Sequence, residues 1–245
     1  MVSFVDAFWS FLPLILITGA TLLVYIRGRK VNGRMMEHTS EEIKDVMSPY
    51  GVERLIEEKR TSSGLVLDGK VKRGDAPIRS FRAVLSLDDR QLLISYLFMK
   101  LTQPNDYVLF ETTFKSRPKV SLQVIPRQEE GLIRKYAEYL TKLDDISLAE
   151  AVKKREVSSK ITKFDETFLI KTTNRRMALG IVGTAEFVRT MLKMEKAAYW
   201  MAVDRSENVF KAMFKLNESL DMVAFAALFV NMAERIASIK DARRH

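Results

Sequence analysis

"AFWSFLPLILITGATLLVYI", residues Ala7 to Ile26, decides how this chain is built. These twenty residues include no charged side chain. At a rise of 1.5 Å per residue, a helix of this length covers about 30 Å, which is the thickness of the hydrocarbon layer of a bilayer. The core helix of a soluble protein rarely stays uncharged for so long. We therefore predict a transmembrane helix over residues 7–26, with a buried helix or hairpin of a soluble domain as the alternative.

The residues around this stretch favour an uncleaved span. Trp9 and Tyr25 lie near its two ends, where amphipathic rings prefer the membrane interface. A signal peptide would carry positive charge before the apolar run and a cleavage site after it, but here Asp6 precedes the run and a basic cluster follows. The cluster, predicted to lie at the lipid headgroups, is Arg27, Arg29, Lys30 and Arg34.

Topology follows from this cluster. By the positive-inside rule, residues 1–6 form a stub outside and the remainder of the chain faces the cytosol, at an archaeal plasma membrane or the endoplasmic reticulum. Three small residues, Thr18, Gly19 and Ala20, lie near the middle of the span. Small residues let helix backbones approach closely, so these form a candidate face for an intramembrane partner, with lipid exposure all round as the alternative.

The length after the span and the composition of the chain limit the classes of function that are expected. About 215 residues follow it, which suits one large domain or two small ones. The chain has no cysteine, which excludes disulfides and thiolate sites. With two histidines, His38 and His245, neither a zinc site nor a histidine general base is expected. A net charge of +9 favours polyanionic partners such as lipid headgroups or RNA.

Sequence motifs of enzymes are missing. There is no phosphate-binding loop, no dinucleotide-binding glycine pattern and no nucleophile elbow. Gly180 and Gly183 in "LGIVGTAEF" have the wrong spacing and no lysine follows them, so they predict a turn or close helix packing. We predict no catalytic, cofactor-binding or metal-binding residues and expect that the protein is not an enzyme.

Residues 27–60 are predicted to form a basic juxtamembrane segment and a charged helical elbow. Ser40 is a plausible N-cap, and Pro49 to Gly51 should break the helix before it continues to Arg60. The stretch from Gly64, "GLVLDGKVKRG", predicts a short hairpin or an edge strand.

Residues 61–239 are predicted to form an α+β domain. Strands are expected at 78–87, 105–114 and 119–125, with helices at 90–101 and 129–143. A polar stretch at 153–163 follows. Strands are then expected at 166–173, 197–203 and 208–216, with helices at 174–194 and 218–239. The last helix has an apolar run of twelve residues, which is too short to span, so a core helix is predicted.

The order strand, helix, strand, strand, helix thus occurs twice, which raises the possibility of two β-α-β-β-α halves. Sequence identity between the halves is poor. The firmer prediction is a single α+β domain in which the sheet and helices share one core, and the duplication stays open.

Basic residues gather in three places after the span. A polyanion such as ribosomal RNA could bind them, and a solvated basic face is the alternative. The candidate contacts are Lys153, Lys154, Arg155, Arg175, Arg176, Lys240, Arg243 and Arg244. The last three belong to residues 240–245, predicted to be a basic C-terminal stub.

A stretch in the middle of the chain resembles a known family. Residues 88–114, "DDRQLLISYLFMKLTQPNDYVLFETTF", are similar to the cytosolic domain of calumin, a single-span protein of the endoplasmic reticulum with a C-terminal coiled coil. That family has an Arg-Gln pair opening an apolar helix, a proline-containing loop and an aspartate entering an alternating strand. The matching residues are Arg90, Gln91, Leu93, Leu97, Asp106, Val108 and Thr113, with Pro104 displaced by one position.

The resemblance implies a role in membrane protein biogenesis. Calumin-type proteins scaffold the PAT complex, an intramembrane chaperone at the ribosome-bound Sec translocon, and their small partner Asterix shields polar segments of new multipass proteins. The implied partners are the Sec translocon, the ribosome, an Asterix-like membrane protein, nascent multipass membrane proteins and membrane lipids. The chain departs from the family before the span, where an acidic calcium-binding region is expected, and after Ile239, where the coiled coil would begin. A short form without a calcium role is therefore expected.

The sequence thus predicts a non-enzymatic, membrane-anchored scaffold. The alternative is a membrane-anchored enzyme or regulator that acts on an anionic lipid or metabolite. A deep pocket with convergent carboxylates or arginines would favour the enzyme.

Overall fold

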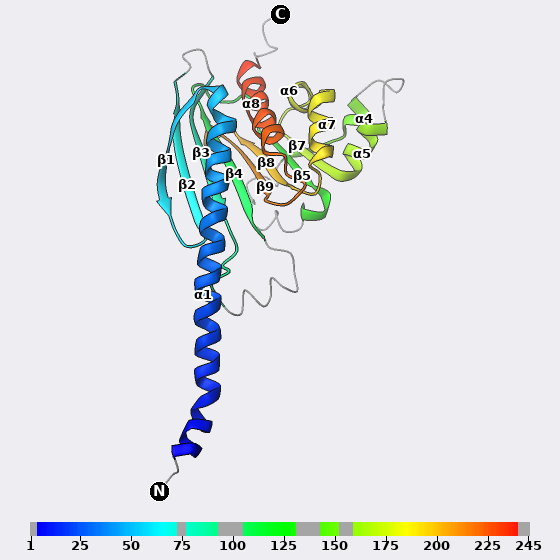
Figure 1. Cartoon of the computed structure of the whole chain (residues 1–245). Helices are drawn as coiled ribbons and strands as arrows, with labels where there is room; N and C mark the ends of the chain where they lie inside the picture. Colours follow the sequence, from blue (N-terminus) through cyan, green and yellow to red (C-terminus); the bar gives the residue numbers. More distant parts are fainter. Residues whose placement is uncertain (1–3, 73–76, 93–104, 131–142, 152–158, 240–245) are drawn as a thin grey trace, which may run out of the picture.

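The computed structural model describes residues 4–72, 77–92, 105–130, 143–151 and 159–239, and combines helices with one antiparallel sheet (Figure 1). This confirms the predicted α+β class. The strands are β1 Val52–Arg60, β2 Gly64–Val71, β3 Ile78–Ser86, β4 Tyr107–Phe114, β5 Leu122–Pro126, β6 Asp144–Ile146, β7 Phe168–Thr172, β8 Ala198–Asp204 and β9 Val209–Lys215. The helices are α1 Phe4–Met47, α4 Leu148–Ala151, α5 Ser159–Thr167, α6 Arg175–Val182, α7 Ala185–Lys193 and α8 Met222–Ser238, with 3-10 turns η1 Ser48–Tyr50 and η2 Arg127–Glu129.

Helix α1 contains the predicted span and extends well beyond the rest of the molecule (Figure 1). It is the one described helix long and apolar enough to cross a membrane. Its apolar side chains between Phe11 and Ile26 are largely exposed, and Leu23 retains 70% of its surface. These residues therefore cover no part of the body, as expected of a helix segment surrounded by lipid.

The second half of α1 belongs to the body. The helix runs without a break through Ser40, so the predicted N-cap is wrong. The predicted break at Pro49 to Gly51 is present, because α1 ends at Met47 and the chain turns through η1. Met36, Ile43 and Met47 are buried in the main core. Packing of this apolar stripe on the core keeps α1 continuous at Ser40, where the capping residue alone predicted the start of a new helix.

Residues 52–60 form strand β1 at the edge of the sheet, and the predicted helix there is wrong. The chain turns at Gly51, which has a φ of 77° and follows η1. Strand β1 then pairs with β2 in an antiparallel ladder. Pairing overrides the helix propensity of glutamate, lysine and arginine, and an edge position lets these charged side chains face water.

Two further predictions need correction. Gly64–Val71 is an internal strand between β1 and β3 and not an edge. Part of the predicted polar stretch is helix α5, which ends at Thr167, so strand β7 begins at Phe168, two residues later than expected. In α5 the buried Phe164 and the partly buried Ile161 pack on the core, and the other side chains of the helix are polar.

The core lies between the sheet and the helices that cover one of its faces, which we call the inner face. Helix α8 crosses this face, and Phe225 and Phe229 pack on the strands. The ring centroids of Phe110 and Phe225 are 4.4 Å apart, and those of Phe210 and Phe229 are 4.7 Å apart. The prediction that α8 is a core helix is therefore confirmed. We call the opposite face of the sheet the outer face.

The two predicted halves share a single sheet. Its strand order is β1-β2-β3-β4-β9-β8-β5-β7-β6, so strands of the two halves are neighbours at its centre. The order does not repeat, because β3 pairs with β4 whereas its counterpart β7 pairs with β5 and β6. The helices predicted at 90–101 and 129–143 lie almost wholly outside the described residues. The duplication therefore stays a prediction that the strand order does not support.

Candidate functional site: the joint between span and body

The joint between the span and the body begins at Gly28, where the backbone of α1 lies against the backbone of Arg90. Gly28 is buried, and a Cβ atom at this position would lie 2.1 Å from the carbonyl oxygen of Arg90. No side chain fits in that space, so glycine lets α1 lie directly against the turn after β3. Gly33, on the same helix, has open space around its Cβ position. The requirement for glycine is therefore specific to residue 28.

A buried polar cluster completes the joint one turn later. Asn32 is fully buried and Asp106 is 3% exposed. The guanidinium of Arg90 forms an ion pair with Asp106 and donates from Nη1 to Asn32 Oδ1 at 2.8 Å. Asn32 Nδ2 in turn donates to the carbonyl oxygens of Asp88 at 3.1 Å and Ser62 at 3.2 Å. One asparagine on α1 thus contacts two connections of the sheet, the turn between β1 and β2 and the segment that follows β3.

Hydrogen bonds from the neighbouring turns connect the remaining polar groups of the cluster. Asp106 Oδ1 accepts from the backbone N–H of Asp88 at 2.8 Å, and Gln91 Nε2 donates to the carbonyl oxygen of Ser62 at 3.1 Å. The backbone N–H of Asn105 donates to Asp88 Oδ2 at 2.7 Å. A buried charge pair that is hydrogen-bonded in this way resists opening, because removing one partner leaves an uncompensated buried charge.

When α1 spans a bilayer, the joint begins within the headgroup layer at Gly28 and reaches just beyond its outer edge at Asn32. Asn32 follows Ile26 by six residues, or about 9 Å of helix. The polar layer on each side of the hydrocarbon is roughly 5–8 Å thick. In that placement the body begins at the outer edge of the headgroup layer, and α1 continues into it without a break.

Three of the eight residues that carry the calumin-type resemblance lie at this joint. Arg90, Gln91 and Asp106 all take part in it, and Val108 lies in the adjoining strand. Leu93, Leu97 and Pro104 lie outside the described residues. Sequence reasoning singled out the Arg-Gln pair and the aspartate but missed Asn32, because nothing local links residues that are more than fifty positions apart.

The predicted site residues on α1 are accessible. The basic cluster of Arg27, Arg29, Lys30 and Arg34 is exposed, at the point where the helix passes from the span to the body. Thr18, Gly19 and Ala20 are exposed as well, and a Cβ atom on Gly19 would meet nothing within 4 Å. The predicted partner face is therefore free of contacts with the body.

The predicted RNA contacts are described only in part. Arg175 and Arg176 are exposed at the start of α6, and Arg175 lies 3.6 Å from Glu150. The structure brings neither of them to the joint. Lys153, Lys154, Arg155, Lys240, Arg243 and Arg244 lie outside the described residues.

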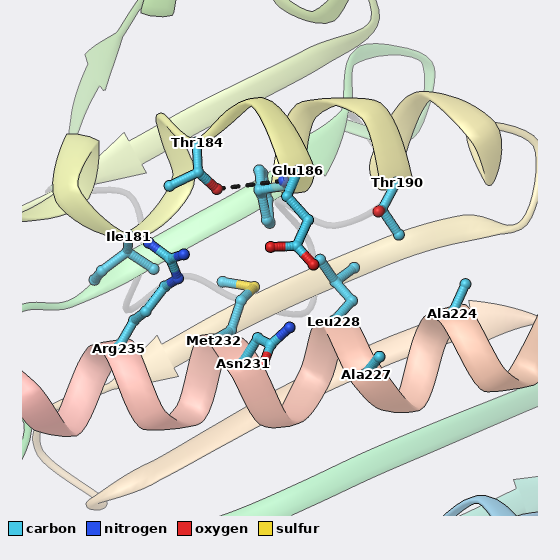
Figure 2. A pocket seen from close by; sticks show the side chains of 11 residues that line it. Ile181, Thr184, Glu186, Thr190, Ala224, Ala227, Leu228, Asn231, Met232 and Arg235 are labelled. Atoms are coloured by element: carbon cyan, nitrogen blue, oxygen red, sulfur yellow. Dashed lines mark hydrogen bonds between the residues drawn. The ribbon is translucent and has the colours of Figure 1, made fainter.

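A groove of about 220 Å³ lies between α7 and α8. Glu186 on α7 and Arg235 on α8 carry their charged ends into the space between the helices, and Asn231 lies between them on α8 (Figure 2). One carboxylate and one guanidinium on a partly exposed groove do not form a set of convergent catalytic groups. Among the described residues, no cluster of three or more histidine, aspartate or glutamate side chains could hold a metal ion.

Comparison with known proteins finds no close relative. No protein-family model matches the chain, and no curated protein matches its sequence. Among solved structures, the crystal structure of the mycobacterial trehalose monomycolate transport factor A, TtfA, is similar with a TM-score of 0.34 and 10% sequence identity. The match covers 80% of this chain and 90% of that one. At this level the likeness carries no argument about function, and the calumin-type resemblance stays a prediction.

Proposed function

We propose that the chain is a non-enzymatic, membrane-anchored scaffold that assists multipass membrane protein insertion at the ribosome-bound Sec translocon. Residues 1–6 lie outside and the body lies in the cytosol. The observation that carries the scaffold role is the buried joint of Asn32, Arg90 and Asp106, which ties the body to the span. The translocon itself is suggested by the calumin-type resemblance.

A joint of this kind suits a scaffold. A rigid connection at the membrane surface gives every surface of the body a fixed height and direction relative to the bilayer. The span remains exposed below it and can bind a small membrane partner through Thr18, Gly19 and Ala20. An Asterix-like protein and nascent multipass proteins are the partners we propose there, with lipid contacts at the basic cluster.

The far end of the body suits a cytosolic partner. The start of α6, with Arg175 and Arg176, and the end of α8 lie at the end of the body opposite the span (Figure 1). Exposed arginines at that end can contact ribosomal RNA above the membrane. Such contacts release counterions, so binding should weaken steeply as salt rises.

The test is to identify what copurifies with the tagged full-length chain after gentle solubilisation. The proposal expects Sec translocon subunits, ribosomes at low salt and a small multipass protein. Gly19→Leu should lower recovery of the small partner several-fold while the chain stays in the membrane, because the added side chain keeps helix backbones apart. Thr21→Leu is the matched control, since it adds bulk roughly 200° further round the helix.

Two outcomes would count against the proposal at different levels. Equal recovery of the small partner with both variants would reject the intramembrane face. Absence of translocon subunits and ribosomes from the parent preparation at low salt would reject the translocon assignment.

A further inference from the structure

The outer face of the sheet carries a row of charges that alternate in sign. Asp68, Arg82, Glu111 and Lys211 are direct neighbours across β2, β3, β4 and β9. Arg82 Nε donates to Asp68 Oδ1 at 2.7 Å, and Lys211 Nζ lies 3.6 Å from Glu111 Oε2. In that order the four side chains are 36%, 44%, 23% and 30% exposed. The row is paired within the sheet and still open to solvent.

An apolar row runs beside the charged row on the same face. Val66, Val84, Leu109 and Met213 are direct neighbours across the same four strands. All four are half-buried, although α8 covers only the other face. The outer face therefore presents a stripe of apolar side chains bordered by a stripe of charges, which resembles the core and rim of an interface.

The membrane restricts how two such faces can meet. Two copies anchored in one bilayer with the same orientation can be related by a twofold axis only when that axis follows the membrane normal. The strands β2 to β4 run roughly along the upper half of α1 (Figure 1), so this axis also follows the strands. Rotation about it keeps each cross-strand row at its height and turns the row end for end.

We propose that the outer face is a dimer interface, on which a second copy of this chain packs its own outer face about a twofold axis between β3 and β4. The inference rests on α1 spanning the membrane and needs no assumption about the translocon. End-for-end reversal places Asp68 opposite Lys211 of the second copy, and Arg82 opposite Glu111 of the second copy. A row of signs −, +, −, + complements itself under this reversal, whereas +, −, −, + would place like charges opposite each other.

The apolar row matches itself in the same arrangement. Reversal places Val84 opposite Leu109 of the second copy and Val66 opposite Met213 of the second copy. In this one arrangement, the charged row faces the charged row of the second copy and the apolar row faces the apolar row, because the axis keeps each row at the same distance from the membrane. Sheets that pack face to face usually do so with their strands within about 30° of each other, as this axis requires.

The size of the face predicts a weak dimer. Four strands of about eight residues cover roughly 19 by 26 Å, or about 1,000 Å² in total for two copies, which is the lower end for a specific interface. Counting about 10 Å for each pair of packed layers, the two spans lie roughly 30 Å apart. The face of Thr18, Gly19 and Ala20 therefore stays free for a different partner.

The experiment measures dimerisation of the full-length chain in phosphatidylcholine vesicles by energy transfer. The chain has no cysteine, so Ser116→Cys, in the exposed loop after β4, gives a single labelling site. The parent should show energy transfer that excess unlabelled parent removes. Arg82→Glu and Glu111→Arg should each raise the dissociation constant about tenfold, because each turns two symmetric exposed attractions into repulsions.

The double variant distinguishes a dimer interface from a row of charges that pair only within one sheet. Arg82→Glu with Glu111→Arg places like charges side by side within each sheet but restores opposite charges across the interface. It should therefore recover most of the parent's dimerisation while remaining no more stable than either single variant. Arg189→Glu, at an exposed position of α7, is the control and should leave energy transfer unchanged.

Three results would overturn the proposal. The first is a parent that shows no transfer beyond chance proximity. The second is a double variant that dimerises no better than the single variants. The third is loss of the chain from membranes on carbonate extraction, which would remove the orientation on which the symmetry argument depends.

Discussion

The two faces of the sheet are built on different principles. The inner face is a continuous layer of large side chains, in which Phe81, Phe110, Phe210 and Phe214 are fully buried beneath α8. The outer face has half-buried apolar side chains and paired charges that remain open to solvent. Neighbouring residues on one strand, such as Phe110 and Leu109, therefore experience opposite environments.

The difference shows what fixes the fold and what is left for binding. On the inner face, stability depends on filled volume, because a removed side chain leaves a cavity. On the outer face, Arg82 holds the pKa of the Asp68 carboxyl below its usual value through their hydrogen bond. Asp68 therefore stays charged at neutral pH.

The largest expected effect is the loss of stability caused by a substitution on the inner face. Phe110 stacks on Phe225 and contacts Phe81 with ring centroids 5.0 Å apart. Phe110→Ala should lower the free energy of unfolding by about 3–5 kcal/mol. Leu109→Ala, one residue away on the outer face, should cost about 1 kcal/mol or less, because its side chain already meets solvent. Urea titration of the dilute, detergent-solubilised chain measures both.

Equal costs for the two substitutions would contradict the contrast between the faces. A large cost at Leu109 alone would indicate that the outer face is covered in the monomer. That result would also remove the surface on which the second copy is proposed to pack.

The second effect concerns how α1 is held against the body. Gly28→Ala forces a Cβ atom against the Arg90 carbonyl, so α1 must shift, and the free energy of unfolding should fall by about 1–3 kcal/mol. Gly33→Ala is the matched control on the same helix. It should raise stability by up to about 1 kcal/mol, since alanine is the better helix former and the space is open.

Hydrogen exchange of the Asn32 region gives an independent measurement. It should be faster in Gly28→Ala and unchanged in Gly33→Ala, because only the first variant opens the joint. Equal behaviour of the two variants would show that the close approach at Gly28 does not hold the helix.

Sequence reasoning recovered the elements whose pattern is local. The apolar helix over residues 7–26, the strands around β3, β4, β8 and β9, and the core helix α8 all follow from uncharged length or periodicity. It failed at 52–60, where charged residues favour a helix and only pairing with β2 makes a strand. It also failed at Ser40, where a good capping residue lies inside a continuous helix.

The site was predictable only in part for the same reason. The basic cluster and the small residues of α1 lie together because they are adjacent in the chain. The joint required Asn32 to meet Arg90, and the outer rows required the order β2-β3-β4-β9, and neither can be deduced from spacing. Antiparallel register, once known, turns scattered charges into an ordered row.

The smallest expected effect concerns the start of α8, which covers the inner face. Asp221 caps this helix by accepting from the backbone N–H of Ala224 at 2.9 Å, and Lys193 Nζ lies 2.7 Å from its other oxygen. The hydrogen bond from Lys193, followed by the cap, lowers the pKa of the Asp221 carboxyl. A lowered pKa in the folded state means that the carboxylate adds stability above its unfolded pKa of about 3.9, and that this is lost as pH falls through the folded value.

Asp221→Ala should therefore cost about 1 kcal/mol at neutral pH, the usual worth of an N-cap. Asp221→Asn keeps a capping oxygen and loses the charge, so it should cost only a few tenths, because the pair with Lys193 is exposed. The difference in the free energy of unfolding between the parent and Asp221→Asn should shrink as pH falls below about 4. Only the parent has a carboxyl at residue 221 that becomes protonated in this range. Urea titrations from pH 7 to pH 3 follow that difference, and a difference that stays constant would show that the carboxylate's charge contributes nothing to holding α8 on the sheet.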